Sequence, residues 1–290
     1  MKIIAHMPVR NEIDVIEETV SEVFRWVDTL IVLDGQSTDG THSLLCDLSS
    51  QWKTAGKTLQ VVSEADPGNV FHDHTLRGRL LELTAPHEPD WVLSVDADEI
   101  YDTYLAPNGV EVDPITAIYA AEEIGANVVR CMVPQFWLTF QDLREGALDE
   151  DETISVQQRR RWYSWGHMGT FIWKWNDAHH YPPKVPKRTP ELLGLTWREW
   201  QRAGPLMPIC KHYCFRSLRQ SLARAEERRE RGGRRYYGKY FQNWLIDERL
   251  AGLHYLAEEG RWCTERNHDA VCAYMAGKRT VGGVAERITV

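Results

Sequence analysis

Short apolar runs alternate with amphipathic segments over the first 100 residues, and this alternation constrains the fold more than any other feature. Apolar runs at 2–6, 30–33, 59–62 and 91–95 predict buried strands, and the segments at 13–27, 39–53 and 73–83 predict helices, the second with Thr38 or Asp39 as its N-cap. Strands and helices that alternate at this spacing are typical of right-handed crossovers and a parallel sheet. We therefore expect an α/β fold with a mostly parallel central sheet flanked by helices.

The rest of the chain has a weaker pattern. A short helix and a strand at 128–133 follow the Pro- and Gly-bearing stretch 101–114. Residues 217–231 predict a strongly charged helix, within a segment that carries eight arginines between positions 216 and 235. No linker separates these parts, so we expect one main domain with an Arg-rich helical extension.

Composition excludes several classes of protein. The chain has 290 residues, of which 43% are hydrophobic and 26% charged, which is too apolar for a disordered protein. The longest run without Asp, Glu, Lys or Arg covers residues 162–173, whereas a membrane span needs about 20 apolar residues. The N-terminus lacks a signal-peptide core, and the six cysteines form no CxxC pair. These features predict a cytoplasmic protein without a transmembrane segment.

The net charge of -8 conceals a division between the two halves of the chain. Residues 1–150 carry 9 basic and 27 acidic side chains, and residues 151–290 carry 25 basic and 15 acidic ones. Such asymmetry is typical of a cation-binding part joined to an anion-binding part, although two differently solvated surfaces also explain it.

Two carboxylates follow the fourth expected strand, at Asp96 and Asp98. Carboxylates at i and i+2 in a tight turn can both bind one hard cation such as Mg²⁺ or Mn²⁺, whose remaining positions substrate phosphates usually fill. An Asx turn that caps the next segment is the alternative interpretation.

Polar turns also follow the first and second expected strands, at residues 7–12 and 34–41. Each turn alone is explained as a turn and helix cap. In a parallel sheet, however, the carboxyl ends of the strands share one edge, where ligands bind. The sequence therefore predicts that chemistry takes place at this edge.

The three turns together resemble the motifs of family 2 glycosyltransferases, which have the GT-A fold. They are Pro-x-Arg-Asn-Glu at 8–12, Asp-Gly-x-Ser-Thr-Asp-Gly-Thr at 34–41 and Asp-Ala-Asp-Glu at 96–99, in family order. The resemblance implies a GT-A domain over residues 1–215, with 216–290 packed on it or continuous with it. It also implies sugar transfer from a UDP-, GDP- or dTDP-linked donor to a saccharide, lipid-linked or other hydroxyl acceptor, with Mn²⁺ or Mg²⁺. Inversion is the family's commonest outcome, and a retaining enzyme of the same fold is the alternative.

The resemblance also implies roles for individual residues. Pro8, Arg10 and Glu12 line the nucleotide pocket, Asp34 contacts the base, Arg77 or Arg79 lies near the nucleotide or its diphosphate, Asp96 approaches the ribose and metal, and Asp98 is the direct metal ligand. Downstream, His212 is a candidate for the metal and Lys211 for the diphosphate. A zinc site at Cys210, His212 and Cys214 lacks a fourth ligand at normal spacing.

The catalytic base is expected in the acidic run 149–152, with Asp151 as first choice and Glu150 beside it. A carboxylate within hydrogen-bond reach of the acceptor hydroxyl is what an inverting transferase needs. A solvated acidic loop is the alternative interpretation of this run.

Two basic segments allow other interpretations. The Gln-x-x-Arg-Trp pattern at 158–162 also occurs in processive polysaccharide synthases, but in an Arg- and Trp-rich segment a chance match explains it. A weaker hypothesis is that Arg161 and Trp162 face the acceptor, because an aromatic ring packs on a sugar and Arg pairs with phosphate. The Arg-rich segment could instead bind nucleic acid or an anionic surface. Its interspersed Glu226, Glu227 and Glu230 favour a solvated helix over nucleic-acid binding.

Overall fold

The computed structural model of the chain describes residues 1–65, 73–106, 108–139, 142, 154–181, 190–192, 195, 201–217, 219–221, 223–224, 227, 245–246 and 254–255. The chain divides into two compact units. Unit 1 comprises Met1–Met132 and Met168–Cys210, and unit 2 comprises Val133–His167 and Lys211–Val290. Each unit is described by itself.

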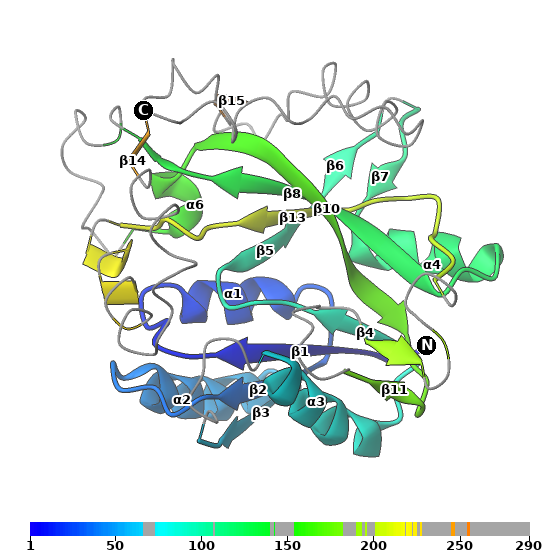
Figure 1. Ribbon diagram of the computed structural model, residues 1–290, viewed down its shortest axis with the longest axis horizontal. Coiled ribbons are helices and arrows are strands. Elements are labelled where there is room, and N and C mark those ends of the chain that lie inside the picture. Colours follow the sequence, from blue (N-terminus) through cyan, green and yellow to red (C-terminus); the bar gives the residue numbers. More distant parts are fainter. Residues whose placement is uncertain are drawn as a thin grey trace. The chain divides into compact units, whose positions relative to one another are not determined.

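Unit 1 is built on four parallel strands, β1 (Ile3–Val9), β2 (Thr29–Asp34), β3 (Thr58–Ser63) and β4 (Trp91–Ser94), in the order β3-β2-β1-β4 (Figure 1). The predicted strands are confirmed, each with ends shifted by up to three residues. Nearly all side chains of β1, β2 and β4 are buried, as their continuous apolar runs require.

Helices cover both faces of these strands. Leu80 of α3 (Asp73–Thr84) packs against Ile4, Ile31 and Leu33. Because side chains alternate along a strand, Leu30 and Val32 of β2 face the opposite side, where they are also buried. Helices α1 (Ile16–Val23) and α2 (Thr41–Thr54) contact each other, and Phe24 packs on Trp52 with ring centroids 4.7 Å apart.

The sheet continues beyond β4 in the order β10-β8-β13-β5. These strands are β10 (Trp162–Lys174), antiparallel to β4, then β8 (Val128–Phe136), β13 (Ile209–His212) and β5 (Glu99–Asp102). Shorter elements are η1 (Ala85–His87), the pair β6 (Tyr104–Leu105) and β7 (Glu111–Val112), α4 (Pro114–Glu123) with Asp113 as N-cap, and the pair β11 (His179–His180) and β12 (Glu191–Leu192). The predicted α/β class with a mostly parallel sheet flanked by helices is confirmed.

The second helix begins later than predicted. Its N-cap is Gly40, in the left-handed region at φ 102°, and neither Thr38 nor Asp39 occupies that position. The Asp39 carboxylate instead bridges two segments, because it accepts hydrogen bonds from the backbone N–H of Ile13 at 3.1 Å and of Thr41 at 2.9 Å. Residues 13–15 form a turn, and α1 starts at Ile16 and not at Ile13.

Unit 2 has an aromatic and basic interior. Phe136 stacks on Tyr213 with ring centroids 4.5 Å apart. Arg160 and Arg216 are fully buried, and they donate to the backbone carbonyls of Phe215 and Tyr213 at 3.3 and 3.4 Å. Arg216, the first arginine of the Arg-rich segment, is therefore a core residue that lies just before the predicted helix 217–231.

The remaining described elements of unit 2 are short. They are β9 (Leu138–Thr139), which pairs with β14 (Leu245–Ile246), α6 (Val156–Arg159), and β15 (His254–Tyr255), which pairs with the start of β10. Within the predicted helix 217–231, residues 219–221, 223, 224 and 227 are helical. The predicted boundary at 215/216 stays a prediction, because most residues beyond it lie outside the described ranges. In the described part of the chain, every helix is too short or too polar to span a bilayer.

Candidate functional site

Three predicted motifs lie at one edge of the sheet in unit 1. Strands β2, β1 and β4 are parallel neighbours, and the register aligns Val9 of β1 with Asp34 of β2. The backbone N–H of Gly35 donates to the Val9 carbonyl at 2.9 Å, and that of Val95 donates to the His6 carbonyl at 3.1 Å. The turns that follow all three strands therefore begin at neighbouring positions of the same carboxyl edge.

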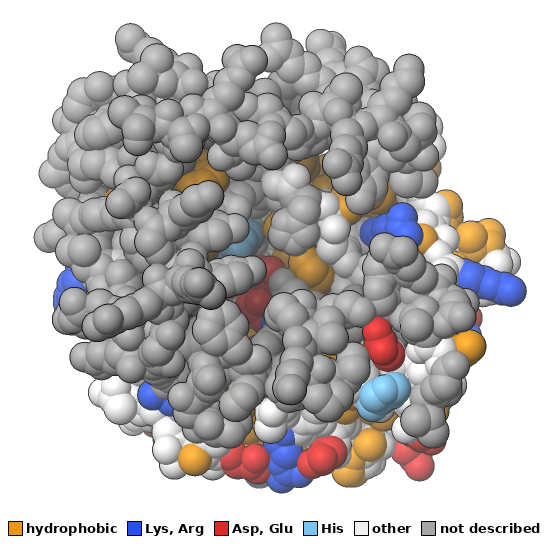
Figure 2. All heavy atoms as spheres, viewed as in Figure 1, with side chains coloured by type: hydrophobic (Ala, Val, Ile, Leu, Met, Phe, Trp, Pro, Cys, Tyr) orange, Lys and Arg blue, Asp and Glu red, His pale blue; other side chains and the backbone are white. Residues whose placement is uncertain are grey.

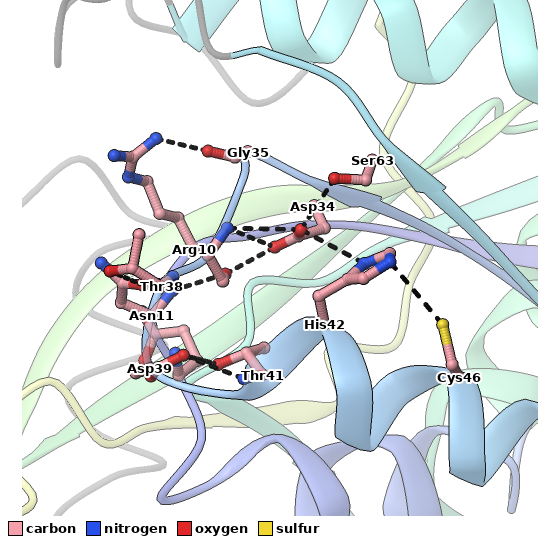
Figure 3. Close-up of polar contacts among 12 residues, drawn as sticks. Arg10, Asn11, Asp34, Gly35, Thr38, Asp39, Thr41, His42, Cys46 and Ser63 are labelled. Carbon is pink, nitrogen blue, oxygen red and sulfur yellow. Dashed lines mark hydrogen bonds and ion pairs between the residues drawn. The ribbon is translucent and has the colours of Figure 1, made fainter.

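Asp34, the last residue of β2, is fully buried and surrounded by donors (Figure 3). The backbone N–H of Ser37 lies 3.2 and 3.3 Å from its two oxygens, and the Ser37 hydroxyl also donates to Oδ1. Oδ2 accepts from Ser63 Oγ at 3.1 Å and lies 3.4 Å from His42 Nδ1. The carboxylate is thus held mainly by neutral hydrogen-bond donors.

The turn after β1 is tied to the turn after β2. Arg10 Nη1 donates to the Gly35 carbonyl, and Asn11 Oδ1 accepts from the Thr38 backbone N–H at 2.7 Å. Glu12 is buried, and its backbone N–H donates to Thr41 Oγ1 at 2.9 Å. Pro8 lies within β1 opposite Leu33. Arg10 and Glu12 are therefore placed at the same rim as Asp34, on a turn with several backbone anchors.

The turn that carries Asp96 and Asp98 is closed by Glu99. The backbone N–H of Asp96 donates to Glu99 Oε2 at 3.0 Å, and the backbone N–H of Glu99 donates to the Asp96 carbonyl at 3.0 Å. From α1, Thr19 Oγ1 donates to the Ala97 carbonyl at 2.6 Å. Three hydrogen bonds, from residues of β5 and α1, therefore hold the turn that carries the two aspartates.

Arg77 of α3 forms an ion pair with the first aspartate. Its Nη2 lies 2.9 Å from Asp96 Oδ1, and its Nη1 donates to Ser94 Oγ at 3.3 Å. Arg77 is buried at 3% exposure and Asp98 at 4%, whereas the Asp96 side chain is 32% exposed. Asp96 Oδ1 thus accepts from Arg77, and the Glu99 carboxylate accepts from the backbone N–H of Asp96.

Arg79, the other arginine of α3, is bound to different carboxylates. Its Nε and Nη2 donate to Glu64 Oε1 at 2.9 and 2.8 Å, and its Nη1 donates to Glu82 at 2.8 Å. These partners raise the pKa of Arg79 above its ordinary value. Figure 2 shows acidic and basic side chains side by side along the lower edge of this view, where Figure 1 draws α2 and α3. Of the two arginines, Arg77 is therefore the one in contact with the Asp96 turn.

The downstream candidates lie in unit 2 or outside the described residues. Lys211 is buried and donates to Gln157 Oε1, and His212 at the end of β13 is half-buried. Cys214 Sγ accepts from Gln135 Nε2 at 3.0 Å. Asp151 and Glu150 lie outside the described residues.

A cation would find oxygen ligands at Asp96 and Asp98. Within the described ranges, no group of three or more His, Cys, Asp or Glu side chains is arranged to hold a metal. This finding covers Cys210, His212 and Cys214, which are all described. A Mg²⁺-type ion needs only one or two protein carboxylates when substrate phosphates and water supply the other ligands. The residues present therefore fit a cation shared with a phosphate-bearing ligand, and not an all-protein metal site.

Three functional neighbours were not predicted from the sequence. Ser63 follows from the parallel register, since it is paired with Asp34. The position of His42 in the first turn of the helix after Asp34 was the available signal for its contact with Asp34. Glu99 is adjacent to the aspartate pair, and only the turn geometry reveals its role.

Comparison with known proteins gives a likeness to solved structures alone. No protein-family model and no curated protein sequence matches the chain. The chain is similar to the mannosyltransferase PcManGT from Pyrobaculum calidifontis in complex with GDP-Man and Mn²⁺, with 20% identity and a TM-score of 0.32 over 45% of this chain and 35% of that chain. It is also similar to GalNAc-T7 with UDP, GalNAc and Mn²⁺, with 12% identity and a TM-score of 0.31 over 48% of this chain and 24% of that chain. The likeness spans a minor part of each protein, so the chemistry of this chain is argued from its own residues.

Proposed function

We propose that the chain is a metal-dependent glycosyltransferase of the GT-A type, which transfers a sugar from a UDP-, GDP- or dTDP-linked donor to an acceptor hydroxyl. The observation that supports this most is the convergence of three polar strand ends on one edge of the parallel sheet, with Arg10, Asp34 and Asp96 at their tips. Ligands of open α/β sheets bind in the crevice outside this edge.

In this proposal the Asp96 turn holds the cation. Asp98 is the direct ligand, and Asp96 approaches the cation and the ribose. Arg77 fixes one oxygen of Asp96 by the 2.9 Å contact, so Arg77 is a positioning residue for the acidic pair. When bound, the cation neutralises the charge that develops on the departing nucleoside diphosphate.

The nucleotide is proposed to lie against the turns after β1 and β2. Asp34 accepts hydrogen bonds from the base, and Pro8, Arg10 and Glu12 line the pocket. Arg77 or Arg79 lies near the nucleotide or its diphosphate; the contact of Arg77 with Asp96 favours Arg77. The neutral donors around Asp34 hold the carboxylate in place for this purpose.

The transfer step also requires groups from the later part of the chain. Asp151 or Glu150 is proposed as the base that takes the proton of the acceptor hydroxyl, whose oxygen attacks the anomeric carbon as the bond to the diphosphate breaks. Lys211 is proposed to meet the diphosphate and His212 the cation. The expected outcome is inversion at the anomeric carbon. The acceptor is a saccharide, a lipid-linked or another hydroxyl, and the expected location is the cytoplasm, free or peripheral at a membrane.

The test is a panel of UDP-, GDP-, dTDP- and CMP-sugars, each titrated by calorimetry with Mn²⁺, with Mg²⁺ and with EDTA. The proposal predicts cation-dependent binding of at least one donor and cation-dependent release of its nucleotide. The two similar solved structures guide the choice of Mn²⁺ and of UDP and GDP ligands without supporting the assignment. No binding and no nucleotide release across the whole panel would refute it.

For a donor that is hydrolysed or transferred, the anomeric configuration of the product is read by NMR. An inverted product supports the proposal, whereas a retained configuration would replace it with a retaining enzyme of the same fold. Glu123→Gln, at an exposed carboxylate at the end of α4, is the matched control for carboxylate variants and should bind donors as the unmodified chain does.

A further inference from the structure

A cysteine, a histidine and an aspartate form a chain of contacts along the start of α2 (Figure 3). Cys46 Sγ lies 3.7 Å from His42 Nε2, and His42 Nδ1 lies 3.4 Å from Asp34 Oδ2. Cys46 and His42 are four residues apart on one helix, which places them on the same face. The imidazole therefore lies between a thiol and a buried carboxylate, with one ring nitrogen toward each.

The four described cysteines differ in accessibility. Cys131 and Cys210 are fully buried, and Cys214 is half-buried with an amide N–H donated to its sulfur. Cys46 is exposed, and the His42 side chain is 43% exposed. An external reagent can therefore reach Cys46 while the neighbouring carboxylate of Asp34 stays buried.

This arrangement contains the parts of an activated nucleophile: a thiol, a base within reach of its proton, and a carboxylate 3.4 Å from the other ring nitrogen of that base. With its ring proton on Nδ1, beside Asp34, His42 presents the lone pair of Nε2 to the thiol. Nδ1 of the same ring lies 3.4 Å from Asp34 Oδ2.

We propose that Cys46 is a thiol-modification site that reacts with low-molecular-weight disulfides such as glutathione disulfide, with His42 as its base. This inference does not depend on the proposed glycosyltransferase activity.

The reaction is a thiol–disulfide exchange. His42 Nε2 accepts the Cys46 proton, and the thiolate attacks one sulfur of the disulfide RSSR, so that a Cys46–SR bond forms and the S–S bond of the reagent breaks. The leaving thiolate takes the proton back from the imidazolium and departs as RSH. The disulfide is the only co-reactant, and no further oxidant is consumed.

The test compares rates at individual cysteines in the full chain. The protein is incubated with glutathione disulfide, quenched at intervals and analysed by peptide mass spectrometry, which resolves Cys46 from every other cysteine. A free thiol is only a few per cent ionised at neutral pH, so loss of the base in His42→Gln or His42→Asn should slow the Cys46 reaction about tenfold. Ser43→Ala, at an exposed position of the same helical turn, should keep the original rate.

The buried thiols report whether a variant is folded. Cys131 and Cys210 stay unreacted as long as unit 1 is folded, and the result is read from whichever His42 variant preserves this protection. An unchanged Cys46 rate without His42, or an equal loss in Ser43→Ala, would overturn the proposal. A unit that unfolds in both His42 variants would overturn it as well, since His42 would then be a structural residue.

Discussion

Two carboxylates, Asp34 and Asp96, lie at the carboxyl edge of the same sheet, and they are held in different ways. Asp34, at the end of β2, is surrounded by hydroxyl and backbone N–H donors and by His42 from the following helix. Asp96, after β4, is paired with the guanidinium of Arg77 from the preceding helix. Asp34 is fully buried among hydrogen-bond donors, whereas Asp96 is partly exposed beside a buried guanidinium. In the proposed function, Asp34 contacts the base and the Asp96 turn holds the cation.

The largest expected effect is on donor binding when the turn with Asp96 and Asp98, which is proposed to hold the cation, is changed. Asp98→Asn removes the proposed direct ligand, so cation-dependent binding of the donor should fall by at least about 100-fold, since even outer partners of metal ligands contribute about 10–100-fold. Isothermal titration with Mn²⁺ measures this. Binding equal to that of Glu123→Gln would show that the cation is held elsewhere.

Stability should also distinguish the two arginines of α3. Arg77→Met leaves Asp96 beside an uncharged side chain. A broken buried ion pair costs about 3–5 kcal/mol, and because Asp96 is partly exposed we expect the free energy of unfolding to fall by about 2 kcal/mol. Arg79→Met removes only surface ion pairs to Glu64 and Glu82, so the free energy of unfolding should fall much less than in Arg77→Met. Urea unfolding of the two variants measures both values. Equal losses would contradict the distinction between a buried and a surface arginine.

Asp34→Asn tests the carboxylate that is proposed to contact the base, in contrast to Asp98. The amide accepts hydrogen bonds poorly in place of a charged carboxylate, so nucleotide affinity should fall about tenfold, near the 1.5–3 kcal/mol of a hydrogen bond to a charged group. The loss should be the same with and without the cation, because Asp34 is proposed to contact the base. Titration of the free nucleotide in EDTA and in Mn²⁺ distinguishes a contact of Asp34 with the base from a contact with the cation. A loss of affinity seen only with Mn²⁺ would mean that Asp34 acts on the cation and not on the base.

The smallest effect concerns the neutral donors of Asp34. Ser63→Ala removes one hydroxyl donor at 3.1 Å, which should lower the free energy of unfolding by about 1 kcal/mol. Thermal or urea unfolding is the measurement. A loss above that of Arg77→Met would mean that the donors, and not the buried arginine, dominate the stability of this edge.

Much of this edge is predictable from the sequence because its strands are continuous apolar runs followed by polar turns. Once the strands are parallel, the tips with Asp34 and Asp96 must share an edge, whereas the pairing of Ser63 with Asp34 depends on a register that only the structure gives. The start of α2 was harder, since the Asp39 carboxylate can cap a helix or, as here, bridge to Ile13.

The partners of the arginines could not be predicted in the same way. Arg77 and Arg79 are two residues apart on one helix, so their directions differ, but only tertiary packing decides which one meets Asp96. Arginine side chains are mostly exposed to solvent, yet Arg216 is fully buried, because backbone carbonyls such as that of Tyr213 accept hydrogen bonds from its guanidinium. Such long-range pairings leave no periodic signal in the chain.

The most direct test of the central claim is a crystal structure of the full chain with Mn²⁺ and the nucleoside diphosphate that binds best in the donor panel. We expect an anomalous manganese peak at about 2.0–2.4 Å from an Asp98 oxygen. The diphosphate should lie at the ion, and the nucleotide base should lie beside Asp34. A manganese ion remote from Asp98, or a nucleotide bound away from the carboxyl edge of β1, β2 and β4, would contradict it.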